Sequence, residues 1–140
     1  MNKFLHIIYI GQSKDYLQEI AQQEQLSLTV VANSLEAVNY LTSGPKPDAV
    51  VCDYHLPGQN GFFLFDWLRQ QSVFDTTPFV LLAGKFSKEV FKSALLKRVD
   101  DYVITAVTPA ETLLGRLKYL CNYRKQFKNS TLPVLTNEVY

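Results

Sequence analysis

The stretch VVCDYHLPGQNG, residues 50–61, begins as a run of small apolar residues that ends on one carboxylate, Asp53. Because polar residues do not alternate with apolar ones in this run, it is typical of a strand buried on both faces of a parallel sheet. Pro57-Gly58 and Asn60-Gly61 then predict a loop rich in turns. The stretch therefore predicts a lone acid at the carboxyl end of a buried strand, the edge at which open parallel sheets bind ligands.

Strand-like apolar runs alternate with amphipathic helical segments along the rest of the chain. The expected strands cover residues 4–10, 26–32, 48–53, 79–83 and 101–105. Two helices are expected to follow Ser13 and Ser34 as N-caps, and two more are expected over 61–71 and 87–98. The last helix is expected to begin at the capping box Thr108–Glu111, with Pro109 at its first position, and to end at about Lys125. This alternation predicts an α/β fold, a doubly wound five-stranded parallel sheet with five helices on its two faces.

Composition narrows the class of protein. The chain has 140 residues, 47% hydrophobic and 19% charged, which is ordinary for a globular domain. We expect one domain over residues 1–125 and a tail or linker stump over 126–140. A net charge of +1 gives no electrostatic reason to expect nucleic acid or a membrane as partner.

The cysteines and the chain start bear on the cellular compartment. Cys52 and Cys121 are far apart in apolar segments, which favours packed thiols in a reducing compartment over a disulfide framework. The start MNKFLHIIYIG has too short an apolar stretch for a secretion signal, and no apolar run approaches the length of a membrane span. These features predict a cytoplasmic protein.

Three segments of the chain resemble the receiver domains of two-component response regulators. They are DAVVCDYHLPGQNGFFLFDWLR (48–69), TPFVLLAG (77–84) and DDYVITAVTPAE (100–111), and the likeness extends over roughly residues 3–125. The resemblance implies a flavodoxin-like fold, a signalling module rather than an enzyme, and a place in a phosphorelay. It also implies that Asp53 is the phosphoacceptor and that Tyr102 is the switching aromatic residue.

The chain departs from the family at the positions that surround this aspartate. The resemblance implies two acids after the first strand to hold Mg²⁺, a hydroxyl residue ending the fourth strand, and a lysine ending the fifth. The first two positions are Gly11 and Gln12, the third is Ala83, and the fourth is Thr105. We therefore expect an atypical receiver in which Mg²⁺-dependent phosphorylation is weakened or lost, with no cofactor unless phosphorylation is retained.

Three other interpretations of the edge at Asp53 stay open. Asp53 could still be phosphorylated, with Asp15 or the backbone carbonyl of His55 helping to hold the metal. Asp53 could instead be a strand-ending residue that caps the loop amides. The chain could also be a small flavin- or nucleotide-binding protein on the same fold, although the segment GQSKDY offers only one glycine and one serine for a phosphate loop.

The segment GFFLFDWLRQQ suggests a contact surface. It has more large apolar residues than one core-facing stripe can hold, so Phe63 and Trp67 are expected to point outward. Loops or the 126–140 tail could cover them instead. Expected partners are signalling proteins, either a histidine kinase or a downstream protein, and possibly a second copy of the chain. Tyr102 is expected to be locked in one orientation, because Ala83 offers no hydroxyl to switch towards.

Overall fold

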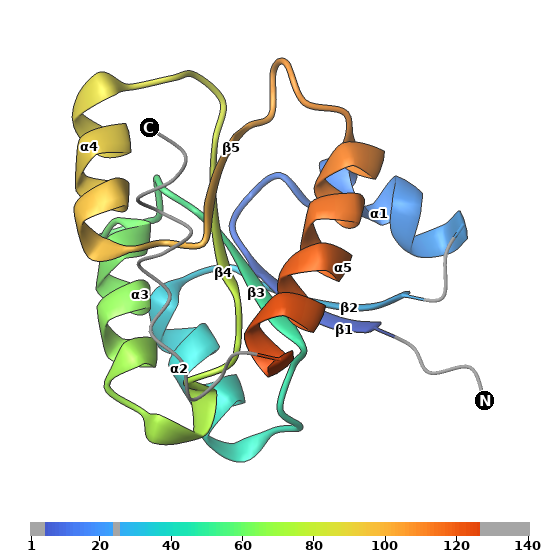
Figure 1. Ribbon diagram of the computed structural model, residues 1–140, viewed down its shortest axis with the longest axis vertical. Helices are drawn as coiled ribbons and strands as arrows, with labels where there is room; N and C mark the ends of the chain where they lie inside the picture. Colours follow the sequence, from blue (N-terminus) through green and yellow to red (C-terminus); the bar gives the residue numbers. More distant parts are fainter. Residues whose placement is uncertain (1–4, 24–25, 127–140) are drawn as a thin grey trace.

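The computed structural model describes residues 5–23 and 26–126 and has five parallel strands, in the order β2-β1-β3-β4-β5 (Figure 1). The strands are β1 (Leu5–Ile10), β2 (Leu26–Val31), β3 (Ala49–Asp53), β4 (Phe79–Ala83) and β5 (Asp101–Ile104). The helices are α1 (Lys14–Gln23), α2 (Ser34–Ser43), α3 (Gly61–Arg69), α4 (Lys88–Lys97) and α5 (Ala110–Gln126), with a short 3₁₀ helix, η1 (Ser72–Phe74). The predicted fold class is confirmed.

Both faces of the sheet are covered by helices, α1 and α5 on one side and α2, α3 and α4 on the other (Figure 1). Successive residues of a strand therefore enter different cores. In β1, Ile8 and Ile10 join the core under α2, α3 and α4, whereas Ile7 and Tyr9 join the core under α1 and α5. This double burial explains why the strands read as unbroken apolar runs.

The order of the strands reverses at β1, which pairs with β2 on one side and with β3 on the other. The β1–β3 register pairs Ile10 with Cys52, so the residues that follow β1 come beside Asp53. Open α/β sheets bind ligands at such a switch point. The fold thus brings the start of the β1–α1 loop and the end of β3 to one place.

The ends of several helices differ from the sequence prediction. Asn33, not Ser34, caps α2: its side chain accepts a 2.9 Å hydrogen bond from the Glu36 amide. Glu36 reaches back past the cap to accept the Ala32 amide at 3.0 Å. Ser34 therefore lies inside the helix. Likewise α5 begins after Pro109, and α3 ends before residue 71. The tail is expected over 126–140, but Gln126 is still the last residue of α5. Residues 127–140 lie outside the described residues.

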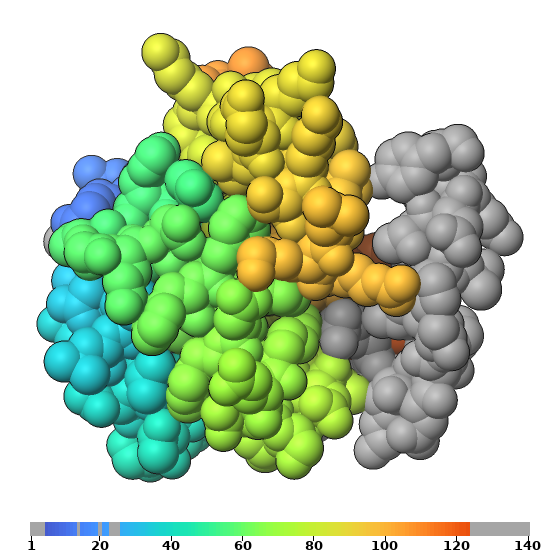
Figure 2. Space-filling model, turned by 90° about the vertical axis from the view of Figure 1, so that its left-hand side faces the viewer, coloured from blue at the N-terminus to red at the C-terminus, as the bar shows by residue number. Residues whose placement is uncertain are grey.

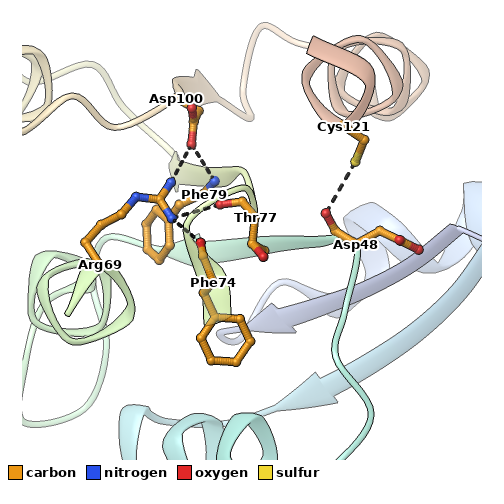
Figure 3. A network of polar contacts seen from close by, with 7 residues as sticks. All are labelled: Asp48, Arg69, Phe74, Thr77, Phe79, Asp100 and Cys121. Atoms are coloured by element: carbon orange, nitrogen blue, oxygen red, sulfur yellow. Dashed lines mark hydrogen bonds and ion pairs between the residues drawn. The ribbon is translucent and has the colours of Figure 1, made fainter. Parts of the chain in front are cut away.

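A partly buried ion pair fixes the opposite, amino edge of the sheet (Figure 3). Arg69 donates to the carbonyls of Phe74 and Thr77. It also donates to the Asp100 carboxylate at 2.9 Å. The same carboxylate accepts the Phe79 amide at 2.8 Å. The Asp100 side chain is 8% exposed. The ion pair therefore ties the end of α3, the start of β4 and the loop before β5 to one another.

Cys52 and Cys121 are buried thiols that are not joined in a disulfide, as the sequence predicts. The Cys121 thiol donates to the Asp48 carbonyl at 3.4 Å, which links α5 to the segment before β3 (Figure 3). Among the described residues, no helix combines the length and the apolar character needed to cross a membrane.

Candidate functional site at the carboxyl edge of the sheet

The Asp53 carboxylate is held by two hydrogen bonds, one to each oxygen. The Tyr9 hydroxyl donates to Oδ1 at 2.7 Å, and the Gln12 amide donates to Oδ2 at 3.1 Å. The same Tyr9 hydroxyl accepts the Ser13 amide at 2.7 Å. Asp53 is therefore anchored by a buried phenol from β1 and by the backbone of the loop that follows it.

The part played by Tyr9 is not foreseen by the sequence analysis, which treats this residue as part of a buried strand. Its ring is fully buried under α1 and α5, and its length carries the hydroxyl to the end of the sheet. One feature of the sequence could have indicated this role: Tyr9 is a phenol within an otherwise aliphatic run, IIYI, two residues before Gly11. A buried tyrosine hydroxyl usually has a polar partner.

Gly11 lies against this pair and has no room for a side chain. A Cβ atom there would be 2.3 Å from Asp53 Oδ2 and 2.5 Å from the Tyr9 hydroxyl oxygen. The φ angle of Gly11 is +155°, a conformation that other residues rarely adopt. The resemblance leads us to expect an acid at position 11. The Tyr9 hydroxyl and the Asp53 carboxylate fill the space that its side chain would need.

Gln12 contacts Asp53 only through its backbone. Its side-chain amide donates to the Ala32 carbonyl at 3.2 Å, which turns it towards the end of β2. The structure therefore brings Gly11 and Gln12 to Asp53, as the sequence predicts, but neither presents a charged oxygen.

A cleft of about 160 Å³ opens on the other side of Asp53. Its lining consists of Ser13, Asp53, His55, Leu82, Ala83, Gly84 and Thr105. Asp53 is the only carboxylate among these residues, and no lysine or arginine lines the cleft. The Thr105 hydroxyl donates to the Ala83 carbonyl at 3.4 Å, so its proton is directed towards the main chain. Asp15 lies exposed in the first turn of α1 and is not part of the lining.

Burial sets the protonation behaviour of the two anchored groups. Burial raises the pKa of Asp53, and the hydrogen bonds from Tyr9 and Gln12, together with nearby His55, only partly oppose the shift. Burial, followed by the hydrogen bond to Asp53, also raises the pKa of Tyr9 well above its usual range. Tyr9 therefore keeps its proton at physiological pH and remains the donor of the pair.

Residues 12–116 of the chain match the family model described as "Response regulator receiver domain". The chain belongs to this family. Among solved structures, the receiver domain resembles a putative response regulator from Chloroflexus aurantiacus (TM-score 0.76, 22% identity, 86% of this chain and 99% of that one). It also resembles the signal receiver domain of a signal transduction histidine kinase from Syntrophus aciditrophicus (TM-score 0.75, 25% identity, 91% and 97%).

Two curated relatives are longer than this chain. The phosphate regulon transcriptional regulatory protein PhoB of Escherichia coli is 33% identical over 82 residues, which cover 59% of this chain and 35% of PhoB. The alkaline phosphatase synthesis transcriptional regulatory protein SphR of Synechococcus elongatus is 29% identical over 133 residues, 89% of this chain and 51% of SphR. The receiver domain thus spans about a third to a half of these relatives.

The residues around Asp53 do not fit the Mg²⁺ ion that the family resemblance implies. Mg²⁺ requires near-octahedral oxygen ligands, usually with one or two carboxylates among them. Among the described residues, no three His, Cys, Asp or Glu side chains are grouped so that they could hold a metal. Asp53 itself already accepts a hydrogen bond at each oxygen.

Tyr102 lies outside the cleft and packs against the start of α4. Its hydroxyl accepts the Ser87 amide at 3.2 Å, and its ring lies 6.2 Å from Phe86 and 6.3 Å from Phe91, centroid to centroid. Ser87 is also the N-cap of α4, because its side chain accepts the Val90 amide. Tyr102 is thus held by the residues that begin the helix.

The expected pair of outward aromatic residues on α3 is only half right. Phe63 is 46% exposed, but Trp67 is partly buried against the core, with its ring 6.2 Å from that of Phe74. The cause is η1, which turns the chain back after α3 and brings Phe74 beside Trp67. Two apolar residues on and just before α4, which the sequence pattern did not single out, are more strongly exposed than Phe63: Leu96 (85%) and Phe86 (59%).

Proposed function

We propose that this receiver domain acts in two-component signal transduction through protein contacts, with Mg²⁺-dependent phosphorylation of Asp53 weakened or lost. Family membership supports the signalling role. The Tyr9–Asp53 hydrogen bond is the observation that supports the weakened or lost phosphorylation. A neutral donor holds the carboxylate at the place where the resemblance implies a metal ion. In this proposal Asp53 occupies the phosphoacceptor position but is chiefly an anchor for the loop after β1.

Electrostatics supports the loss of phosphorylation. An aspartyl phosphate would carry roughly −2 of charge at an edge with no lysine or arginine in its lining. Removing even one preorganised contact from a transition state commonly costs about 3 kcal/mol. The groups that the resemblance implies at positions 11, 12, 83 and 105 would act as a unit, so the energetic costs of their absence cannot be added. All of them nevertheless work in the same direction.

The two alternatives that keep a phosphate at this edge gain no support from the geometry. Of the two groups named for holding the metal, Asp15 does not line the cleft, whereas His55 does. A single backbone carbonyl beside Asp53 is a poor substitute for two carboxylates as ligands of Mg²⁺. A phosphate loop for a flavin or nucleotide needs free backbone amides. The amides of Gln12 and Ser13 are already donated to Asp53 and Tyr9.

We assign the protein contacts to the face formed by α3, α4 and the loop before α4. Figure 2 shows this face, with α3 in green beside α4 in yellow. Its exposed apolar residues are Phe63, Phe86, Leu95 and Leu96. The Lys97–Asp66 ion pair at 3.0 Å joins its two helices. Residues 85–98 include five basic side chains and one acidic. This surface suits a histidine kinase or downstream protein with an acidic and apolar face, or a second copy of the chain.

A phosphorylation assay tests the proposal. The full chain is incubated with Mg²⁺ and a small phosphoryl donor, and its intact mass is measured with Asp53→Asn as the matched control. We expect no adduct that depends on both Mg²⁺ and Asp53. A receiver that is phosphorylated under the same conditions shows that the reagents work. An Mg²⁺-dependent phosphoryl adduct that disappears in Asp53→Asn would refute the loss of phosphorylation.

A further inference from the structure

We propose that the Tyr9 hydroxyl prevents a divalent metal ion from binding at the carboxyl edge of the sheet. We also propose that the effect of a substitution at Gly11 depends on which residue stands at position 9. An acid at position 11 would then create a metal site only if Tyr9 also lost its hydroxyl. The inference rests on the proposed function and deepens it, because it names the group that now fills the place of the missing acid.

The first observation is one of space. A Cβ atom on Gly11 would lie 2.5 Å from the Tyr9 hydroxyl oxygen and 2.3 Å from Asp53 Oδ2, distances that real Cβ atoms essentially never show. The Tyr9 ring is fully buried, so the hydroxyl cannot swing away without disrupting the core under α1 and α5. A side chain at position 11 and the phenol oxygen therefore compete for one volume.

The second observation is that this hydroxyl is engaged both as a donor and as an acceptor at this edge. It gives a proton to Asp53 Oδ1 and takes one from the Ser13 amide. The phenol thus offsets the charge of Asp53 and satisfies the first amide after Gln12 without any cation. Changing Tyr9 to Phe leaves the ring in the core but removes both contacts, which frees the Asp53 carboxylate to turn.

Metal titration of matched variants tests the coupling. Mn²⁺ binding, followed by calorimetry, is compared in the wild-type chain, in Gly11→Asp/Gln12→Asp, and in the same double change combined with Tyr9→Phe. We expect the triple variant to bind Mn²⁺ at least about tenfold more tightly than the double variant, which is the size of ordinary coupling between residues in contact. Equal affinity in the two would overturn the inference and leave the proposed function standing. Mn²⁺ binding by the wild-type chain would instead contradict the proposed function.

A second measurement covers the case in which the acidic variants fold poorly. The loss of melting temperature caused by Gly11→Ala is measured with Tyr and with Phe at position 9. Backbone strain at position 11 is common to both pairs and cancels, so we expect the smaller loss with Phe. Tyr16→Phe is the matched control, because the Tyr16 hydroxyl donates to the distant Thr108 carbonyl and its removal should leave the effect of Gly11→Ala unchanged. Equal losses with Tyr and Phe at position 9 would contradict the coupling.

Discussion

Tyr9 and Asp53 lie on neighbouring central strands, and the phenol donates a 2.7 Å hydrogen bond to the carboxylate. This bond stabilises the charged form of Asp53 and therefore lowers a pKa that burial has raised. We predict that Tyr9→Phe raises the pKa of Asp53 further. Carbon-13 NMR of the side-chain carboxyl during a pH titration measures it directly. Tyr16→Phe, the matched loss of another hydroxyl, should leave that pKa unchanged. An unaltered Asp53 pKa in Tyr9→Phe would mean that the bond is weak.

The raised pKa of Asp53 also predicts a pH dependence of stability. The folded state holds this proton more tightly than the unfolded chain, whose Asp pKa is about 3.9. The resulting stabilisation is full below about pH 4 and is lost as pH rises through the folded pKa. The free energy of unfolding of the wild type, minus that of Asp53→Asn, should therefore fall as pH rises from about 4. Urea unfolding at several pH values measures it. Asp101, whose pKa burial also raises, is present in both proteins and cancels. A difference that is flat or rises would contradict the shift.

The strands and the position of Asp53 follow from the sequence because apolar runs and turn residues are local signals. The runs around Val50 and Val80 are buried on both faces of the sheet, so their pattern carries the fold. Gly11, Gln12, Ala83 and Thr105 lie around Asp53 because the register of parallel strands fixes which residues meet at an edge.

The contacts of Tyr9 and Trp67 could not be predicted because both depend on tertiary packing. Nothing local to the segment IIYI indicates that its phenol reaches the end of a strand 44 positions away. In the same way, Trp67 fits the pattern of an exposed residue until η1 brings Phe74 against it. The cap of α2 was misplaced by one residue because Asn33 and Ser34 are both good capping residues.

The ion pair at the amino edge should matter for stability. Arg69→Met removes the ion pair with the Asp100 carboxylate, whose side chain is 8% exposed, and also removes the bonds to two carbonyls. We predict a loss of about 2 kcal/mol, the usual cost of removing a hydrogen bond to a charged group. The matched control is Lys97→Met, which breaks the more exposed pair with Asp66 and should cost less than about 1 kcal/mol. Chemical unfolding measures both variants, and similar losses would show that Asp100 is well solvated without Arg69.

Tyr102 is predicted to keep one orientation. Its hydroxyl is held by the Ser87 amide, and Ala83 provides no alternative partner towards the cleft. Crystals grown with and without Mg²⁺ and beryllofluoride should show the same side-chain rotamer. Tyr102→Phe should lower the free energy of unfolding by about 1 kcal/mol, the value of one ordinary hydrogen bond. A second rotamer in the presence of the phosphoryl mimic would show that the switch is retained.

Leu96 tests the assignment of the contact face. The side chain is 85% exposed, so Leu96→Ser should change the free energy of unfolding by less than about 0.5 kcal/mol. Leu68→Ala, at a fully buried position of α3, should cost about 2–5 kcal/mol. If the face binds a second copy, sedimentation at increasing concentration should show an association that Leu96→Ser weakens. A large loss of stability in Leu96→Ser would mean that this residue is covered and has a structural role.

The most direct test of the central claim is a titration of the isotope-labelled chain with Mg²⁺ and beryllofluoride, followed by amide NMR. The amides of Gln12 and Ser13 are the reporters, because they donate to Asp53 and Tyr9. We predict that neither resonance shows a saturable shift at millimolar Mg²⁺. A saturable shift of both amides that is absent in Asp53→Asn would show a working metal and phosphoryl site and contradict the account.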